Sequence, residues 1–548
     1  MRIGAVFLVL FFIGCGGRSG DDGESARVSC AQIQGTDESL FPSYPFESDP
    51  RDPLMVYQWH LNNFGQRVGN YEASIAGGDI NMPAQPQGRG VTIAIVDTGV
   101  DETHPDLSVN HNRYESWNYQ KNSASPYPNV TDDECAHGTM VAGIAAAVGY
   151  NYQGVRGVAP NAYWAGLNIA DKNASGGCAL YIYPDALSAR PDRHATIDIF
   201  SNSWGAELPR SRADLIPLLE AIQEGAESGR DNRGAIYVFA AGNGRAKGHN
   251  ANYFGEQNSI YTISVAALNS DDRYSSYSNP GSNILISAYG GFDGYGSPGI
   301  VTTDISGCDK GMSTTNNPIM QHTLNRYGEY THHMSGTSAA TPMVSGAIAL
   351  ILEAKPDLTW RNVRYILATT ARRNDPSDDD WRTNGAGWYI NHNYGFGALD
   401  VKAAVQKART FTSLGTLKKK SKTIQNINGA IANDANLTMP INVNEGENLC
   451  IEFVDFTIAM NIGGGRKNNI SLISPDGTVS TLADGRYTTN ASFYSDGRTF
   501  GSVRYLDELS NGEWKVKIEN KSGASYNLTD ANFTLTFYGR NYVGSCKQ

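Results

Sequence analysis

The strongest constraint on the fold of this sequence is a series of short, continuously apolar segments separated by segments with helical periodicity. The apolar segments cover residues 91–96, 162–169, 196–200, 235–241 and 260–267. The helical patterns cover residues 139–148, 213–227 and 338–353. Continuous apolar strands are buried on both faces, and their alternation with helices is typical of a parallel sheet. We therefore predict an α/β fold built on a doubly wound, mostly parallel sheet.

A second, different region follows this α/β pattern. The chain has 548 residues, more than one hydrophobic core normally accommodates. Towards its end, short segments of alternating apolar and polar residues are separated by turns, which predicts an all-β sandwich. The predicted segments are a signal peptide at 1–14, a polar tether at 15–50, an α/β domain at 51–410, a linker at 411–430 and a β-sandwich at 431–548.

The N-terminus has the pattern of an export signal. Arg2 precedes an apolar run at 5–13 that is too short to span a membrane, which is typical of a signal-peptide core. The segment 12–15, Phe-Ile-Gly-Cys, is similar to the cleavage box of bacterial lipoproteins, in which the cysteine receives lipid. We therefore expect a protein anchored by lipid at Cys15, at the outer membrane of a Gram-negative cell. Plain secretion to the outside is the alternative.

The charge and the cysteines narrow the classes of function. The net charge is −11, and the one basic cluster, the lysines at 418–422, lies in the predicted linker, so we expect no nucleic-acid partner. When Cys15 is set aside the chain has six cysteines, and an even number in an exported chain favours disulfides. The sequence leaves their pairing open. Because Cys450 and Cys546 both fall in the predicted sandwich, we expect these two to pair.

Four residues stand in short glycine-containing motifs that suit amide hydrolysis. Asp97 ends a strand in Asp-Thr-Gly, His137 opens a helix in His-Gly-Thr, and Ser338 opens another in Gly-Thr-Ser-Ala-Ala-Thr-Pro. A serine nucleophile needs an imidazole to take its proton and a carboxylate to orient that imidazole. Asn243, in Ala-Ala-Gly-Asn-Gly, can donate its amide to the developing oxyanion together with the Ser338 N–H. The sequence therefore predicts a catalytic set of Asp97, His137, Ser338 and Asn243.

These motifs resemble those of the subtilisin-type serine proteases. The order is Asp, His, Ser, with intervals of 137 − 97 = 40 and 338 − 137 = 201 residues. The segments at 201–205 and 258–262, and the predicted sandwich, are similar to the kexin and proprotein-convertase branch, whose C-terminal sandwich is the P domain. The resemblance covers about residues 50–540. It implies a serine endopeptidase that cleaves protein or peptide substrates through an acyl-enzyme.

Two other functions stay open at this point. One is a narrow-specificity, kexin-like protease that matures chosen partner proteins. The other is a surface binding protein on a protease scaffold, which predicts the loss of a triad residue. All three triad residues are present, so the sequence disfavours this second alternative.

The resemblance also implies a specificity pocket that differs from that of kexin-like enzymes. It assigns substrate binding to Ser203, Trp204, Gly205, Leu208 and Phe254. Relatives that cut after basic pairs carry acids at the positions of Leu208 and Phe254. A buried Lys or Arg head without a carboxylate is costly, so we predict an apolar pocket. A local shift of the alignment, with Glu207 as the pocket acid, is the alternative.

The resemblance further implies a structural calcium ion. The positions that match the ligands of the family are Asp52, Asp106, Val148, Asn151, Gln153 and Val155. Carboxylates, an amide oxygen and backbone carbonyls are the oxygen ligands that Ca²⁺ prefers. The sequence therefore predicts a calcium site.

The predicted tether has a consequence for folding. Relatives carry an N-terminal pro-domain that aids folding, whereas 52 − 15 = 37 positions separate Asp52 from Cys15. This polar segment is too short for such a domain. We expect the chain to fold unaided or with a separate chaperone protein, as a monomer whose only membrane contact is the lipid anchor.

Overall fold

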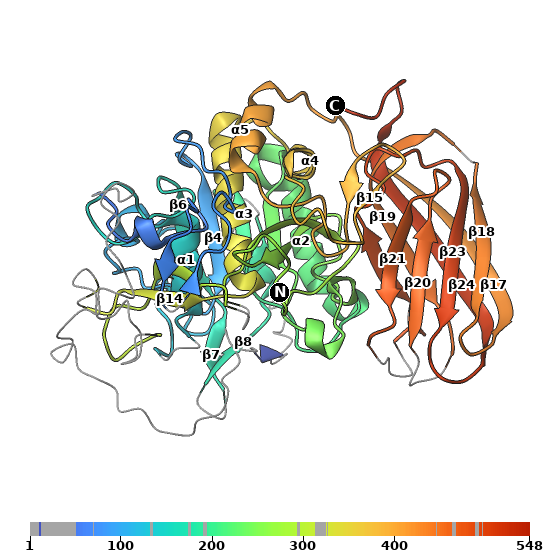
Figure 1. The fold of residues 1–548 in the computed structure, drawn as a ribbon, viewed down its shortest axis with the longest axis horizontal. Coiled ribbons are helices and arrows are strands. Elements are labelled where there is room, and N and C mark those ends of the chain that lie inside the picture. Colours follow the sequence, from blue (N-terminus) through green and yellow to red (C-terminus); the bar gives the residue numbers. More distant parts are fainter. Residues whose placement is uncertain are drawn as a thin grey trace.

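The computed structural model describes residues 10–11 and 51–548, apart from 70, 132–134, 174–176, 190–193, 293–295, 313–324, 326, 445, 463–466, 488–492 and 496. The described chain forms two units that lie side by side (Figure 1), an α/β domain and a β-sandwich. The predicted signal peptide, tether and lipidated Cys15 lie outside the described residues, apart from β1 (Leu10–Phe11).

The α/β domain is built on a seven-stranded sheet whose pairings are all parallel, as predicted. In spatial order its strands are β12 (Ile284–Tyr289), β11 (Thr262–Leu268), β10 (Ile236–Ala240), β9 (Ile199–Asn202), β4 (Thr92–Asp97), β6 (Tyr163–Asn168) and β5 (Trp117–Asn118). After β4 the chain crosses to the edge strand β5 and returns to β6 beside β4, whereas from β9 it runs outward on the other side of β4. The strand order therefore reverses between β4 and β9, where open α/β sheets place their sites.

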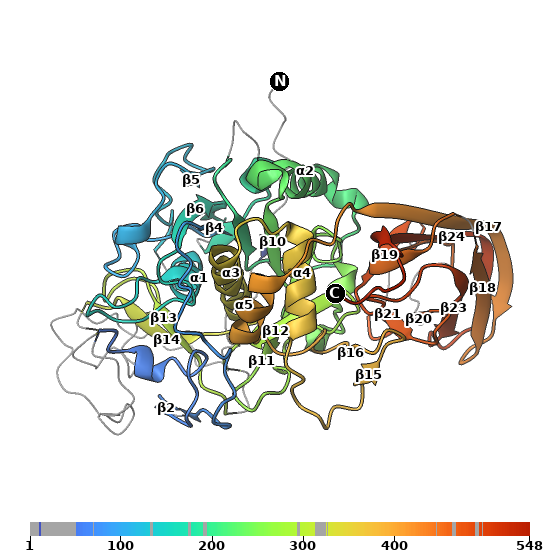
Figure 2. The ribbon, with the colours of Figure 1, turned by 90° about the horizontal axis from the view of Figure 1, so that it is seen from above.

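Helices cover both faces of this sheet (Figure 2). They are α1 (His137–Ala146), α2 (Ile216–Asn232), α3 (Thr337–Ala354), α4 (Trp360–Thr370) and α5 (Val401–Thr410). α1 and α3 pack against each other and against the central strands, and α2 lies across the sheet from them. α3 is long and apolar enough to span a membrane, but 89% of it is buried, so it is a core helix of this domain.

The β-sandwich consists of two four-stranded antiparallel sheets, as predicted. One contains β17 (Lys418–Ile431), β24 (Tyr526–Asn541), β19 (Leu449–Ala459) and β22 (Arg498–Ser502). The other contains β18 (Asn436–Val443), β23 (Gly512–Asn520), β20 (Asn468–Ile473) and β21 (Val479–Asp484). Their inner faces share one apolar core that includes Trp514 and Phe537.

The predicted linker at 411–430 is wrong over most of its length. Residues 418–431 form β17, which pairs with β24. The lysines that suggested a solvated linker are on an edge strand, where Lys418 and Lys419 are exposed while the backbone still pairs. Charged side chains on an edge strand also discourage pairing with other chains.

The remaining elements are short. The small strands are β2 (Arg67–Val68), β3 (Tyr71–Glu72), β7 (Ala170–Lys172), β8 (Cys178–Leu180), β13 (Ile300–Thr303), β14 (Tyr330–Met334), β15 (Arg382–Thr383) and β16 (Tyr389–Ile390). The 3-10 helices are η2 (Met55–Tyr57), η3 (Ser108–Asn110), η4 (Pro184–Leu187), η5 (Ala213–Leu215), η6 (Arg245–Lys247) and η7 (Ala251–Tyr253).

Each of the two units contains at least one internal disulfide. Cys450 and Cys546 are bonded, which confirms the pairing predicted from their shared domain. Cys135 and Cys178 form a second bond in the α/β domain, and Cys308 is disulfide-bonded as well.

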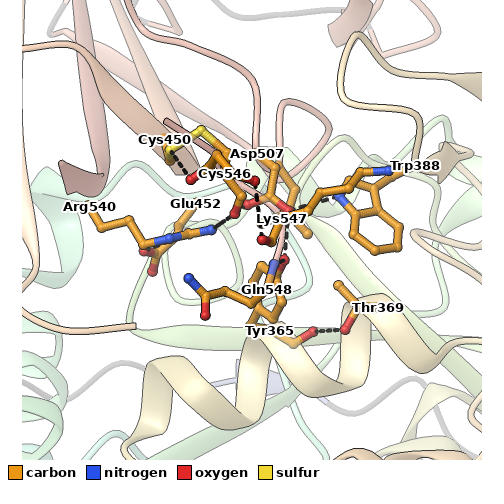
Figure 3. A network of polar contacts seen from close by, with 12 residues as sticks. Tyr365, Thr369, Trp388, Cys450, Glu452, Asp507, Arg540, Cys546, Lys547 and Gln548 are labelled. Carbon is orange, nitrogen blue, oxygen red and sulfur yellow. Dashed lines mark hydrogen bonds and ion pairs between the residues drawn. A yellow bond between two sulfur atoms is a disulfide. The ribbon is translucent and has the colours of Figure 1, made fainter. Parts of the chain in front are cut away.

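A buried polar network fastens the sandwich to the α/β domain (Figure 3). Asp507 of the sandwich accepts hydrogen bonds from the Tyr365 hydroxyl (2.7 Å), the Trp388 indole (2.9 Å) and the Arg540 guanidinium (2.6 Å). Tyr365 and Trp388 belong to the α/β domain, so one carboxylate joins both units.

Two arginines of the α/β domain form further ion pairs with the sandwich. Arg212 binds both carboxylate oxygens of Asp455, at 2.7 and 2.8 Å. Arg361 binds both oxygens of Glu452, at 2.6 and 2.9 Å. Such two-point contacts fix the relative orientation of the partners.

Candidate active site

The carboxylate of Asp97 lies at the carboxyl end of β4, beside the point where the strand order reverses. Its Oδ1 accepts a hydrogen bond from the Thr98 N–H (2.7 Å) and lies 2.8 Å from His137 Nδ1. Both side chains are buried. Because a carboxylate only accepts, Nδ1 carries the proton and Nε2 is left as the basic atom of the ring.

The start of α1 is fixed to the turn after Asp97. The Thr98 hydroxyl donates to the Cys135 carbonyl (2.9 Å) and accepts from the Gly138 N–H (2.8 Å). A Cβ on Gly138 would lie 2.2 Å from the Gly99 carbonyl oxygen, so the close approach of helix and turn requires glycine. The glycines of the motifs thus bring His137 onto Asp97.

Ser338 lies in the first turn of α3 and faces the same cleft as His137. Its hydroxyl donates to the Ser203 carbonyl (3.0 Å), and the Ser203 hydroxyl donates in return to the Ser338 carbonyl (2.9 Å). Both residues line the cleft. The reciprocal pair therefore holds Ser338 against the segment that the sequence predicts to bind substrate.

The amide of Asn243 is oriented by the residue before Ser338. Asn243 Oδ1 accepts from the Thr337 N–H (3.0 Å) and from the Thr337 hydroxyl (2.8 Å). With its oxygen so engaged, the Asn243 amide NH₂ is the end left to donate. A Cβ on Gly336 would lie 2.9 Å from Asn243 Nδ2, so glycine at 336 leaves this amide its room.

A cleft joins these groups. Its lining includes His137, Asn243 and Ser338, and four of the five residues predicted to bind substrate, namely Ser203, Trp204, Gly205 and Phe254. Leu208 is not among the lining residues and is 66% exposed, so the structure does not bring it into this cleft. The preceding residue, Glu207, lines the cleft instead.

The comparisons with known proteins agree with this geometry. The family model described as the subtilase family of peptidases S8 matches residues 88–397, more than half of the chain. The chain belongs to the subtilase family. It is a serine-type endopeptidase, and its C-terminal part matches the proprotein convertase P-domain model over residues 452–537.

Relatives of this subtilase cover nearly all of it. It is 32% identical over 549 residues to the Aeromonas extracellular serine protease of Aeromonas sobria, covering 88% of this chain and 86% of the relative. It is also 32% identical to neuroendocrine convertase 2 of Rattus norvegicus, covering 89% and 74%. A crystal structure of the Aeromonas sobria serine protease superposes with a TM-score of 0.77 at 28% identity, covering 96% and 100%.

Another solved structure is similar over the same extent. It is a complex of the Aeromonas sobria serine protease with a chaperone, and its protease superposes on this subtilase with a TM-score of 0.76 at 27% identity, covering 94% and 99%.

Several lining residues of the cleft were missed from the sequence. They are Leu180, Ala206, Ala240, Gly242, Gly244, His249, Gln257, Asn279 and Thr337. Five of them adjoin residues that were predicted or share a motif with them, namely Ala206, Ala240, Gly242, Gly244 and Thr337. No motif marks the other four, which reach the cleft from separate parts of the chain.

His249 is buried in this wall. Burial and the nearby charges of Lys247 and Arg486 lower the pKa of His249, against the opposing effect of Glu207. The imidazole that lines the cleft is therefore neutral at pH 7.

The residues predicted to bind calcium lie together, but the carboxylates already have donors. Asp52 and Asp106 are both fully buried. Asp52 Oδ1 accepts from the Tyr150 N–H (2.6 Å). Asp106 accepts from the Asn151 amide (2.8 Å) and from the Val155 N–H (3.0 Å). Each of these carboxylate oxygens thus faces an N–H group.

The second oxygen of Asp52 is held by an arginine. Arg156 Nε donates to Asp52 Oδ2 (2.5 Å), its Nη2 pairs with the same oxygen, and its guanidinium lies 3.8 Å from the centre of the Tyr150 ring. Of the other predicted ligands, the Val148 N–H donates to the Asp106 carbonyl (2.8 Å), and Gln153 is exposed. This arrangement neutralises Asp52 within the chain and does not fit the predicted calcium site.

Burial raises the pKa of Asp106 to about 6. The part of the chain that the structure describes contains no cluster of three or more His, Cys, Asp or Glu side chains that could hold a metal ion.

Proposed function

We propose that this subtilase is an exported endopeptidase that uses Asp97, His137 and Ser338 as its triad and Asn243 as its oxyanion donor. The observation that supports this most directly is the 2.8 Å hydrogen bond between Asp97 and His137, in a cleft that Ser338 also lines. The subtilase domain extends over about residues 51–410 and the P domain from about residue 418 to the end of the sandwich.

The proposed mechanism assigns one task to each group. His137 Nε2 takes the proton of the Ser338 hydroxyl as that oxygen attacks the scissile carbonyl, and later gives it to the leaving amine. Asp97 keeps the proton on Nδ1 and stabilises the imidazolium. The Asn243 amide and the Ser338 N–H receive the oxyanion. Water then releases the acyl group from Ser338 by the same steps.

The lining of the cleft supports an apolar specificity pocket. Trp204, Ala206, Ala240 and Phe254 contribute apolar surface, and His249 beside them is neutral. We propose cleavage after Leu, Phe, Tyr or Met. Calcium is left out of the proposed function, because Arg156 already neutralises Asp52.

Glu207 supports a second candidate, a processing protease that cuts after basic residues. Its carboxylate lines the cleft, but it also lies 3.6 Å from Lys247 Nζ and is 42% exposed. An exposed carboxylate with a partner of its own discriminates less well than a buried one. The apolar pocket is therefore the better supported of the two.

A digest of a peptide library by wild type and by Ser338→Ala, followed by mass spectrometry, tests these proposals. Loss of the nucleophile should lower kcat by about 10⁶-fold. Ser228→Ala, on an exposed face of α2, is the matched control and should behave as wild type. Cleavage after Lys-Arg or Arg-Arg would replace the apolar pocket by the Glu207 alternative. Activity retained by Ser338→Ala would overturn the triad.

Export with lipid on Cys15 is the proposed location. It is supported by the N-terminal pattern and by relatives whose names include an extracellular serine protease. Labelling cells with a radioactive fatty acid should mark the wild type and not Cys15→Ser. Label on both, or on neither with the enzyme in the medium, would contradict the anchor.

A separate folding chaperone is a further part of the proposal. It is supported by the Aeromonas sobria protease, which was solved in complex with a chaperone. Expression of this chain without any partner should then give little active enzyme. Full activity from the chain alone would contradict the requirement.

A further inference from the structure

One wall of the cleft is contacted by the P domain. This wall is the segment 244–254, which follows Asn243 and contributes Gly244, His249 and Phe254 to the lining. One of the P-domain segments that contact it is 484–487, at the end of β21. No motif of the sequence marks segment 484–487, and none of its residues lines the cleft.

Arg486 is the polar part of this contact. Its guanidinium donates to the carbonyls of His249 (3.2 Å) and Arg245 (3.5 Å). Asp484 accepts from Arg486 (2.7 Å) and from the Asn250 amide (3.1 Å). The P domain therefore holds the wall segment by the backbone carbonyls of Arg245 and His249 and by the side-chain amide of Asn250.

Tyr487 is the aromatic part of the contact. Its ring lies edge-on to the His249 ring, with centroids 5.7 Å apart. The His249 ring in turn lies edge-on to Phe254, at 5.5 Å. Such pairs are directional as well as apolar. A chain of three rings thus runs from the P domain to the pocket.

The His249 ring depends on this packing for its orientation. Among the described residues, its backbone N–H and carbonyl are hydrogen-bonded, but no group donates to or accepts from its ring nitrogens. Gly248, which precedes it, has a φ of +78°. The rings of Phe254 and Tyr487, together with the closely packed backbone of Gly244, hold the imidazole against the pocket.

We infer that Tyr487 and Arg486 are positioning residues of the P domain that set the P1 preference of the enzyme through His249 and Phe254. The inference rests on the proposed function, because it assumes that this cleft binds the P1 side chain. It assigns the P domain a role in selectivity in addition to its part in the fold. The triad and Asn243 are held by contacts within the subtilase domain, so the chemical step should not depend on these two residues.

The test compares kcat/KM for peptides that differ only at P1, with Phe, Leu, Ala, Gly and Arg. In Tyr487→Ala the ratio of the preferred P1 residue to P1 Ala should fall about tenfold, while P1 Gly is cleaved as by wild type. Tyr487→Phe keeps the ring and should keep the wild-type ratio. Tyr542→Ala removes an exposed tyrosine of the same domain and is the matched control.

These readouts separate positioning from stability. A variant that is only less stable loses activity on all peptides alike, and the P1 ratio stays constant. A constant ratio in folded Tyr487→Ala would overturn the inference. If Tyr487→Ala does not fold, Arg486→Gln replaces it, with the same expected fall and the same overturning result.

A double-mutant cycle tests the path through Phe254. In the Phe254→Ala background, Tyr487→Ala should change the P1 ratio no further, whereas additive effects would overturn the path. The peptide set also distinguishes this inference from the proposed function. If wild type prefers P1 Arg, the apolar pocket fails, but a change of that preference in Tyr487→Ala still supports the inference.

Discussion

The two sides of the cleft are held in different ways. On the catalytic side, Asp97, His137 and Ser338 are held by hydrogen bonds of 2.8–3.0 Å within the subtilase domain. On the specificity side, Phe254 and His249 are held by ring packing that extends into the P domain. Short directional hydrogen bonds leave the side chains of the catalytic side little freedom to move, whereas the position of the wall depends on contacts with the neighbouring domain. Substitutions on the two sides should therefore have different effects.

After Ser338→Ala, the largest fall in kcat is expected from a substitution at Asp97. Asp97→Asn keeps the size of the side chain but can donate to His137 Nδ1, which favours the wrong tautomer. We expect kcat to fall by about 10⁴-fold with an unchanged melting temperature. Steady-state kinetics with one peptide substrate measures the change in kcat. Asp357→Asn, on the surface, is the control. A loss below about tenfold would remove Asp97 from the triad.

The next effect is expected at Asn243. Asn243→Ala removes the oxyanion donor but keeps the triad, so kcat should fall by about 10²–10³-fold with little change in KM. Thr337→Val, which removes the hydroxyl that orients Asn243, should give a smaller loss of the same kind. A rise in KM at constant kcat would instead place Asn243 in ground-state binding.

The placement of Asp97, His137 and Ser338 at one cleft could be predicted from the sequence, and most of the wall could not. Asp97, His137 and Ser338 lie in local motifs whose glycines and strand or helix ends determine their geometry. Leu208 was predicted for the pocket by its offset along the chain, but its side chain is exposed. Residues such as His249 reach the cleft through tertiary contacts that no local pattern encodes.

The same distinction holds for the fold as a whole. The parallel sheet follows from continuous apolar strands, which are determined locally. β17 was missed because its alternation consists of lysines and polar residues, and only its pairing with β24 makes it a strand. Arg156 likewise carries no motif, and its ion pair with Asp52 joins residues 104 positions apart.

The wall itself gives a third prediction. Phe254→Ala should lower kcat/KM for apolar P1 residues by about 10-fold or more, because it removes buried pocket surface. Leu208→Ala, at the exposed position that the sequence favoured, should leave it unchanged. Peptides with P1 Phe and P1 Ala measure both variants. Equal losses in the two would restore Leu208 to the pocket.

A smaller effect is expected where the P domain is attached by a titrating contact. The Thr481 N–H of the P domain donates to His392 Nε2 (2.9 Å), so His392 Nδ1 carries the proton that faces Asp380 (2.8 Å). Burial raises the pKa of Asp380, but the hydrogen bond from His392 and the charge of Arg504 outweigh it and lower this pKa to about 2.

Asp380 should therefore link the two domains in a pH-dependent way. A carboxylate whose pKa is lowered on folding stabilises the fold above its ordinary value of 3.8, and this stability is lost as the pH falls towards about 2. Over that pH range, the melting temperature should change less with pH for Asp380→Asn than for wild type. Asp379→Asn, at the exposed neighbouring position, should follow wild type. If the melting temperature depended on pH in the same way in all three proteins, Asp380 would be excluded as the titrating link.

The smallest effect is expected from removing calcium. Asp52 is fully buried, and Arg156, with 11% of its side chain exposed, supplies its counter-charge from within the chain. The melting temperature of wild type should therefore be the same in excess chelator and in excess Ca²⁺. Arg156→Ala should be strongly destabilised, by about 3–5 kcal/mol, because it leaves a buried carboxylate without its partner.

The response of the melting temperature to calcium should therefore differ between Arg156→Ala and wild type. Without the guanidinium, the buried carboxylates of Asp52 and Asp106 are an oxygen-rich pair of the kind that suits Ca²⁺. Calcium should raise the melting temperature of Arg156→Ala and not that of wild type. Arg233→Ala, which breaks an exposed ion pair with Asp231, controls for the loss of one arginine. A chelator that lowers the melting temperature of wild type would show instead that calcium, and not Arg156, neutralises this site.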